Sequence, residues 1–236
     1  MMYQAEQPIF DEQPVPNRKK YTWILFDLDG TLTDPGQGIR NSVAYALDKM
    51  GLPRQTGQEL NRFIGPPLQE GFRCLCGLDE KRVNEAVAKY REYYQERGIF
   101  ENVPYPGVEQ MLKTLKDNGR NLIVATSKPE VYARQILEHF RLAPYFTFIA
   151  GGNLDGSRCN KGEVIRYALE KCQIHESTCC LMVGDRKHDM IGAKSEGIAT
   201  VGVLYGYGSK EELLMAGADA LAEDVKDITA ICLEKR

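Results

Sequence analysis

The chain has 236 residues, of which 43% are hydrophobic and 27% are charged, and its formal net charge is −3 at pH 7. This length is enough for one large or two small domains with a buried core, and the slight negative charge excludes a general attraction to nucleic acid polymers. No apolar run approaches the roughly 20 residues that a membrane-spanning helix needs. The composition therefore predicts a globular protein that partners neither a nucleic acid nor a membrane.

The N-terminal segment and the cysteines indicate the compartment. Residues 1–20 are polar, contain three prolines and lack the apolar stretch of a signal peptide, so we expect a flexible leader there. The seven cysteines are an odd number and do not follow the spacing of a disulfide framework. The sequence therefore predicts a cytoplasmic protein with reduced cysteines.

The first apolar run, Trp23–Phe26, leads directly into two acids one residue apart, Asp27 and Asp29, and Gly30 and Thr31 then end the strand. Alternate side chains of an extended segment point the same way, so both carboxylates could face one pocket. Two acids at the end of a buried strand are costly unless a cation shares the site. Mg²⁺ beside a phosphate would supply that charge, whereas a solvated Asp-Gly turn explains the motif taken alone.

The segment between Pro35 and Pro104 lacks strong strand patterns and predicts several helices. The expected helices are 38–50, 56–63, 68–76 and 80–96. An insertion of this length is too long for a loop, so we expect a small helical cap over residues 35–104, connected through chain near 33–37 and 102–107.

The cap is expected to lie over the leaving group of a substrate and to set substrate choice. The candidate contact residues are Arg62, Gly65 and Pro66. A turn between two helices explains Gly65 and Pro66 equally well.

Apolar runs and helical patterns alternate after the cap. The expected strands are 121–126, 145–150, 179–184 and 198–203, with helices such as 108–118 and 130–140 between them. This alternation predicts an α/β fold in which helices cover both faces of a parallel sheet. The core is expected to comprise residues 21–34 and 105–236, and ligands of such sheets bind beyond the carboxyl ends of the strands.

Three further motifs fall at or near those strand ends. The run 121–125 ends in Thr126 and Ser127, whose hydroxyls and backbone N–H groups suit a phosphate, although a helix cap is the alternative. Lys161 opens an amphipathic helix, where a cation opposes the helix dipole unless an anion is near. The run 179–183 precedes Asp185, and Asp189 follows four residues later.

The order of these four motifs resembles the haloacid dehalogenase-like hydrolase superfamily over about residues 21–232, which implies a Rossmann-like core with an inserted helical cap. The chain looks most like the phosphoglycolate phosphatase-like branch, and residues 63–68 are similar to members of that branch described as 5′-nucleotidases. The resemblance implies hydrolysis of a small phosphomonoester, with 5′-nucleotides and phosphoglycolate as the leading substrates.

The resemblance also implies residue roles. Asp27 is expected to be the nucleophile that forms an aspartyl-phosphate, and Asp29 the acid that protonates the leaving oxygen and then activates water. The residues expected to bind phosphate are Thr126, Ser127, Lys161 and Gly30. The residues expected to hold a Mg²⁺ cofactor are Asp27, Asp29, Asp185 and Asp189.

Two alternatives to this function stay open. A phosphomutase or sugar-phosphate phosphatase is one, although the mutase pattern has a histidine where this chain has Ile39. A non-catalytic regulator that binds phosphorylated ligands is the other, and the pairing of a nucleophile with an acid argues against it. We expect a monomer or a homodimer.

Overall fold

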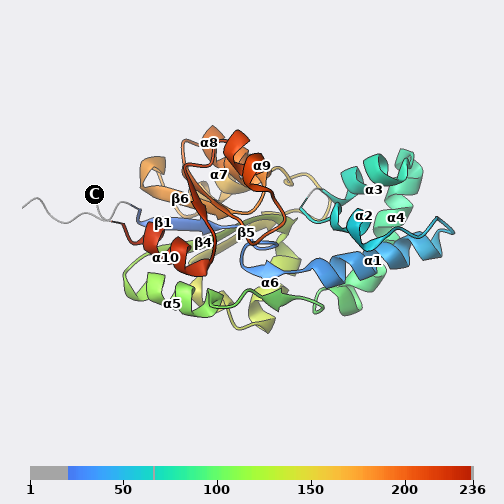
Figure 1. Cartoon of the computed structure of the whole chain (residues 1–236), viewed down its shortest axis with the longest axis horizontal. Helices are drawn as coiled ribbons and strands as arrows, with labels where there is room; N and C mark the ends of the chain where they lie inside the picture. Colours follow the sequence, from blue (N-terminus) through green and yellow to red (C-terminus); the bar gives the residue numbers. More distant parts are fainter. Residues whose placement is uncertain (1–20, 66, 235–236) are drawn as a thin grey trace, which may run out of the picture.

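The computed structural model describes residues 21–65 and 67–234. The expected leader over residues 1–20 and the candidate Pro66 lie outside these residues. Figure 1 shows an elongated molecule in which a sheet with helices on both sides occupies one part and a group of helices the other. In the described part of the chain, none of the helices has the length and apolar character needed to cross a membrane.

A six-stranded sheet forms the larger part, in the order β5-β4-β1-β6-β7-β8, and every neighbouring pair is parallel. Its strands are β1 (Trp23–Phe26), β4 (Asn121–Pro129), β5 (Phe148–Gly152), β6 (Cys180–Gly184), β7 (Ala199–Val203) and β8 (Ala220–Ala222). This is the Rossmann-like α/β architecture that the sequence predicts. The β1 strand lies between β4 and β6, so its C-terminal end is flanked by the ends of both.

The two faces of the sheet bury alternate side chains of the same strands. Ile24 and Phe26 belong to an apolar cluster with α5, α6 and α10, whereas Leu25 belongs to a second cluster with α7 and α8. These helices are α5 (Val108–Asp117), α6 (Glu130–His139), α7 (Lys161–Lys171), α8 (Lys187–Ser195) and α10 (Val225–Cys232), and the short α9 (Lys210–Met215) precedes β8. Burial on both faces explains why the strands are continuous apolar runs.

The helices of the smaller part all fall between β2 (Thr33–Asp34) and β3 (Val103–Pro104), and Figure 1 shows them grouped beyond one end of the sheet. They are α1 (Gly36–Lys49), α2 (Gly57–Asn61), α3 (Leu68–Cys76) and α4 (Glu80–Tyr93), which continues into a π-helix (Tyr94–Gly98). The start of α2 is fixed by a capping box between Thr56 and Glu59.

The two connections to these helices are hydrogen-bonded to one another. The β2 and β3 strands pair antiparallel, with Thr33 opposite Pro104 and Asp34 opposite Val103. The backbone N–H of Tyr105 also donates to the carbonyl of Leu32 at 3.1 Å. The chain therefore leaves and rejoins the sheet at one point.

The expected elements are present, and their bounds differ from the expected ones at several places. Residues 143–145 form a 3₁₀ turn, so the strand expected from 145 begins at Phe148. The helix expected to reach 96 changes to a π-helix at Tyr94. The three-residue β8 was not predicted, because Ala-Leu-Ala carries too little pattern to indicate a strand.

Candidate active site

The carboxyl ends of three adjacent strands bring the predicted motifs together. Phe26 of β1 is in register with Val124 of β4 and Val183 of β6. The residues that follow these positions therefore emerge side by side, which places Asp27 between the ends of β4 and β6. The β1 strand is more than 90 residues from β4 and from β6 in the sequence. The ends of these strands meet at one edge because the strands pair in parallel and in register.

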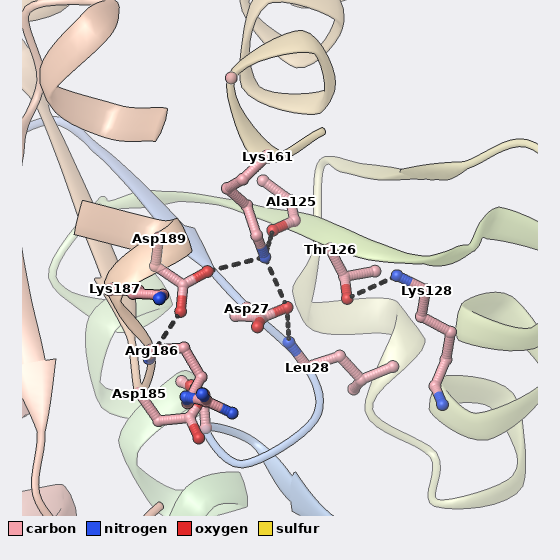
Figure 2. Close-up of polar contacts among 12 residues, drawn as sticks. Asp27, Leu28, Ala125, Thr126, Lys128, Lys161, Asp185, Arg186, Lys187 and Asp189 are labelled. Atoms are coloured by element: carbon pink, nitrogen blue, oxygen red, sulfur yellow. Dashed lines mark hydrogen bonds and ion pairs between the residues drawn. The ribbon is translucent and has the colours of Figure 1, made fainter. Parts of the chain in front are cut away.

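Lys161 lies at the centre of the site (Figure 2). It is the first residue of α7, whose N-terminus is capped by the Asn160 side chain. Its Nζ contacts Asp27 Oδ1 at 2.8 Å and Asp189 Oδ1 at 2.8 Å, and donates to the carbonyl of Ala125 at 3.0 Å. Two carboxylates and one backbone carbonyl thus surround the ammonium group.

The ammonium group of Lys161 stays charged despite its burial. Burial lowers the pKa of this group, but the carboxylates of Asp189 and Asp27 outweigh that effect and raise the pKa above its ordinary value. The lysine is therefore a fixed positive charge at the strand ends. It would stabilise an anionic group that binds next to Asp27.

Asp27 is held by one of its two carboxylate oxygens. Its Oδ1 accepts from the backbone N–H of Leu28 at 2.7 Å, in addition to the contact with Lys161. Among the described residues no hydrogen bond uses Oδ2. The side chain lines a pocket, so Oδ2 is the oxygen free to react there.

Asp29 points toward the same pocket and has its own cation. Its Oδ2 is 2.6 Å from Lys128 Nζ, and Lys128 also donates to the hydroxyl of Tyr94 at 2.6 Å. Asp29 Oδ1 is buried and has no hydrogen-bond partner among the described residues. Burial raises the pKa of Asp29, and Lys128 opposes that rise.

Three carboxylates form a cluster that suits a divalent cation. Oxygens of Asp27, Asp185 and Asp189 all lie within 4.8 Å of one another, and all three residues are buried. Burial, followed by the charges of Asp189 and Asp27, raises the pKa of Asp185 well above its usual range. Burial likewise raises the pKa of Asp189 to about 6, against the effect of Lys161.

The charges at the site do not balance within the protein. Asp27, Asp29, Asp185 and Asp189 contribute four negative charges when ionised, and the two lysines that contact this group contribute two positive charges. A divalent cation with oxygen ligands would neutralise the remainder. The residues present therefore fit the metal that the sequence predicts.

Gly30 shapes the site without entering the pocket. Its φ is +82°, which favours glycine, and a Cβ here would lie 2.1 Å from Asp185 Oδ2. Asp185 is held by the backbone N–H of Tyr207 at 2.8 Å. Neither Gly30 nor Asp185 lines the pocket, so Gly30 acts here by leaving room for a carboxylate.

The pocket contains most of the other predicted site residues. Asp27, Asp29, Thr126, Ser127, Lys161 and Asp189 all line it. Of the cap candidates, Gly65 lines it as well, with a φ of +102° and with Arg186 Nη1 only 2.7 Å from where a Cβ would lie. Arg62 instead lines a neighbouring cavity with Glu70 and Tyr207.

Several lining residues were not singled out from the sequence. Lys128 belongs to the same motif as Thr126, so the sequence could have indicated that Lys128 lies at the site. The aromatic and aliphatic wall had a comparable signal only in the segment 63–68, which contributes Phe63 and Leu68, because its other residues come from distant parts of the chain. Its members are Ile39, Phe63, Leu68, Tyr90, Tyr94, Tyr132 and Leu154.

The inserted helices contact the sheet part around the rim of this pocket. Arg186 Nη1 donates to the carbonyl of Ile64 at 2.8 Å, and its Nε donates to Glu212 at 2.9 Å. On another side, Arg91 donates to the carbonyl of Leu154 at 2.8 Å. These contacts hold the inserted helices against the sheet part at the pocket.

Comparisons with known proteins agree with this arrangement. The family model described as haloacid dehalogenase-like hydrolase matches residues 24–203. A 5′-nucleotidase of Pseudomonas aeruginosa is 46% identical over 194 residues, covering 82% of this chain and 87% of that protein. The crystal structure of a predicted phosphatase from Clostridium acetobutylicum has a TM-score of 0.87 and 46% identity, covering 90% of this chain and 98% of that one.

A relative with a different name also matches. The tyrosine-protein kinase PtkA of Mycobacterium tuberculosis is 43% identical over 185 residues, which cover 78% of this chain but only 62% of that protein. The family match spans the strands that carry all four motifs. The chain therefore belongs to the haloacid dehalogenase-like hydrolase family and is one of its phosphatases.

Proposed function

We propose that the protein is a Mg²⁺-dependent hydrolase of small phosphomonoesters that works through an aspartyl-phosphate on Asp27. The observation that carries this proposal is the contact of Lys161 with both Asp27 and Asp189 at the end of β1. A nucleophile beside a buried cation, with a second acid two residues away, is the equipment that phosphoryl transfer requires.

The first half of the reaction transfers the phosphoryl group to the protein. Asp27 Oδ2 attacks phosphorus as the bond from phosphorus to the ester oxygen breaks, and Asp29 gives its proton to that oxygen. Lys161, Thr126 and Ser127 hold the phosphoryl oxygens and offset the charge that develops on them. The lining of one pocket by all five residues supports this assignment.

The second half releases phosphate. Water attacks the phosphorus of the aspartyl-phosphate while Asp29 accepts a proton from that water, and the bond from phosphorus to Asp27 Oδ2 breaks. Asp29 thereby regains the proton that it gave to the leaving group. The nucleophile and the acid both return to their starting states.

The metal would be held by Asp27, Asp185, Asp189 and the backbone carbonyl of Asp29. When bound, Mg²⁺ supplies positive charge that offsets the charge of the carboxylates and of the phosphoryl oxygens. The proximity and raised pKa values of Asp185 and Asp189 support this ligand set.

A nucleoside is the leaving group that fits the pocket better than glycolate. Part of the pocket lining is aromatic and aliphatic, with Phe63, Tyr90 and Tyr132 among its members. A ribose and base would bury their surface there, whereas glycolate needs a cation for its carboxylate. The guanidinium groups at the rim, Arg91 and Arg186, already donate to carbonyls of the protein.

We further propose that residues 35–104 act as a cap that opens for substrate exchange, and that the protein works in a reducing compartment, the cytoplasm. The pairing of β2 with β3 at the base of the inserted helices supports the first assignment. The seven cysteines, all of them free, support the second.

The test is phosphate release from a panel of phosphomonoesters, with Mg²⁺ and with EDTA, for the wild type, Asp27→Asn and the exposed control Asp117→Asn. We expect Mg²⁺-dependent release that is fastest with a 5′-nucleotide, lost in Asp27→Asn and kept in Asp117→Asn. Faster release from phosphoglycolate or a sugar phosphate would change the substrate class. No release by the wild type would favour a phosphomutase or a non-catalytic binder.

A further inference from the structure

The second lysine of the site, Lys128, has no role in the reaction described above. It follows Thr126 at the end of β4, and its side chain is only 8% exposed. Its Nζ lies 2.6 Å from Asp29 Oδ2 and 2.6 Å from the hydroxyl of Tyr94, and it sits 5.0 Å from the centre of the Tyr94 ring. A buried lysine with such short contacts is fixed in position.

We propose that Lys128 and Tyr94 are positioning residues that orient the Asp29 carboxylate for proton transfer and make this orientation depend on the inserted helices. This inference rests on the proposed function, because it takes Asp29 as the acid of the phosphatase reaction. It concerns a lysine of the second motif and a tyrosine of the inserted helices, neither of which the sequence analysis assigned a role.

The two carboxylate oxygens of Asp29 have different surroundings. Oδ2 is occupied by Lys128, whereas Oδ1 is buried without a hydrogen-bond partner among the described residues. A buried carboxylate oxygen without a partner is costly, so the carboxylate depends on the contact of Oδ2 for its charge partner, while Asp29 as a residue lines the pocket. By holding Oδ2, Lys128 fixes the orientation of the Asp29 carboxylate.

Tyr94 brings the inserted helices into this arrangement. It is the first residue of the π-helix that ends the insertion, and it is 2% exposed. Its ring stacks on Tyr90 with centroids 5.3 Å apart and meets Tyr132 edge-on at 5.5 Å. The hydroxyl that contacts Lys128 is therefore held rigidly, so Lys128 keeps this position only while the inserted helices are docked.

Lys128 differs in its environment from the other cation of the site. Lys161 already contacts the nucleophile Asp27, which is where the phosphoryl group would form. Lys128 instead contacts Asp29, the acid of the proposed reaction. Its removal should therefore impair proton transfer to the leaving oxygen more than binding of the phosphoryl group.

The test compares a poor leaving group with a good one. A 5′-nucleotide releases an alkoxide and needs a proton at once, whereas 4-nitrophenyl phosphate releases a stable phenolate. Release of nucleoside and of 4-nitrophenol is measured in the first turnover, before hydrolysis of the aspartyl-phosphate contributes. The variants are Lys128→Met, Lys128→Arg and Tyr94→Phe. The control is Gln95→Met, which removes another hydrogen bond of the π-helix, to Tyr132 at 2.6 Å, without touching Asp29.

We expect Lys128→Met to slow first-turnover release of nucleoside by about 100-fold or more, and release of 4-nitrophenol by less than about tenfold. Tyr94→Phe should show the same selectivity with a smaller loss, Lys128→Arg should recover part of the loss, and Gln95→Met should show no selectivity. If Lys128→Met fails to fold, Tyr94→Phe still tests the inference, because this variant lacks only one hydroxyl group.

Two results would overturn the inference. Equal losses with both substrates in Tyr94→Phe and Lys128→Arg would mean a structural role, and a rise in KM with an unchanged first-turnover rate would make Lys128 a phosphate-binding residue. Either result requires an active wild type and leaves the proposed function intact. An inactive wild type would remove the proposed function and this inference together.

Discussion

Replacing Asp189 with asparagine should stabilise the metal-free protein near pH 7 and weaken its response to Mg²⁺. Burial raises the pKa of Asp189 from 3.8 to about 6, even though Lys161 opposes the rise. Each pKa unit corresponds to about 1.4 kcal/mol, so keeping this carboxylate ionised at neutral pH lowers the free energy of unfolding by about 3 kcal/mol. Asparagine has no charge to desolvate, and its one carbonyl oxygen can accept either from the backbone N–H of Arg186 or from Lys161, but not from both.

The sign of the effect sets its pH dependence. A carboxylate whose pKa is raised on folding destabilises the protein fully above the folded pKa of about 6, and this destabilisation disappears as the pH falls to 3.8. The advantage of Asp189→Asn over the wild type should therefore be about 3 kcal/mol near pH 7 and nearly absent at about pH 4.

Urea unfolding in EDTA at both pH values measures this difference, with Asp117→Asn as an exposed control that should change stability little. Millimolar Mg²⁺ should then stabilise the wild type more than the variant, because ligands that bind only the folded state raise its stability. A variant less stable than the wild type in EDTA near pH 7, or an advantage that persists at about pH 4, would refute the reasoning.

Three other changes test separate parts of the site. Gly30→Ala should lower the free energy of unfolding by about 2 kcal/mol or more, since the residue has φ +82° and its Cβ would clash with Asp185; unchanged urea unfolding would contradict this. Arg186→Met should raise KM by about tenfold, because it removes a charged hydrogen bond to the Ile64 carbonyl; steady-state kinetics with an unchanged KM would argue against that contact. Phe63→Ala should raise KM for a 5′-nucleotide more than for 4-nitrophenyl phosphate, and equal changes for both would exclude Phe63 from the contact with the base.

The residues that the sequence located are those fixed by local pattern. Asp27 and Asp185 each follow an apolar run that reads as a strand, and the parallel sheet implied by those runs brings strand ends to one edge. The position of Asp27 between the other two strand ends follows from the order β4-β1-β6. That order is set by contacts between distant segments, so the motifs indicated a shared edge but not which of them would be neighbours.

The residues that the sequence did not locate depend on tertiary packing. Tyr94 and Lys128 are 34 positions apart in the sequence, and although Lys128 belongs to the second motif, no local pattern indicates that the two side chains meet. Arg62 and Gly65 are close in sequence, yet they line different cavities. The docking of the whole segment decides which of its side chains face the pocket. A pattern of residue types contains no information about that docking.

The antiparallel pair of β2 and β3 has a consequence for how such proteins diversify. Residues 35–102 leave and return through two strands that lie one ladder spacing apart, about 5 Å. Any other segment whose ends are equally close could be grafted between Asp34 and Val103 without changing the register of the sheet. The part of the pocket wall that the inserted helices contribute can therefore change while the order of the strand ends is kept, but such a change also removes the contact of Tyr94 with Lys128.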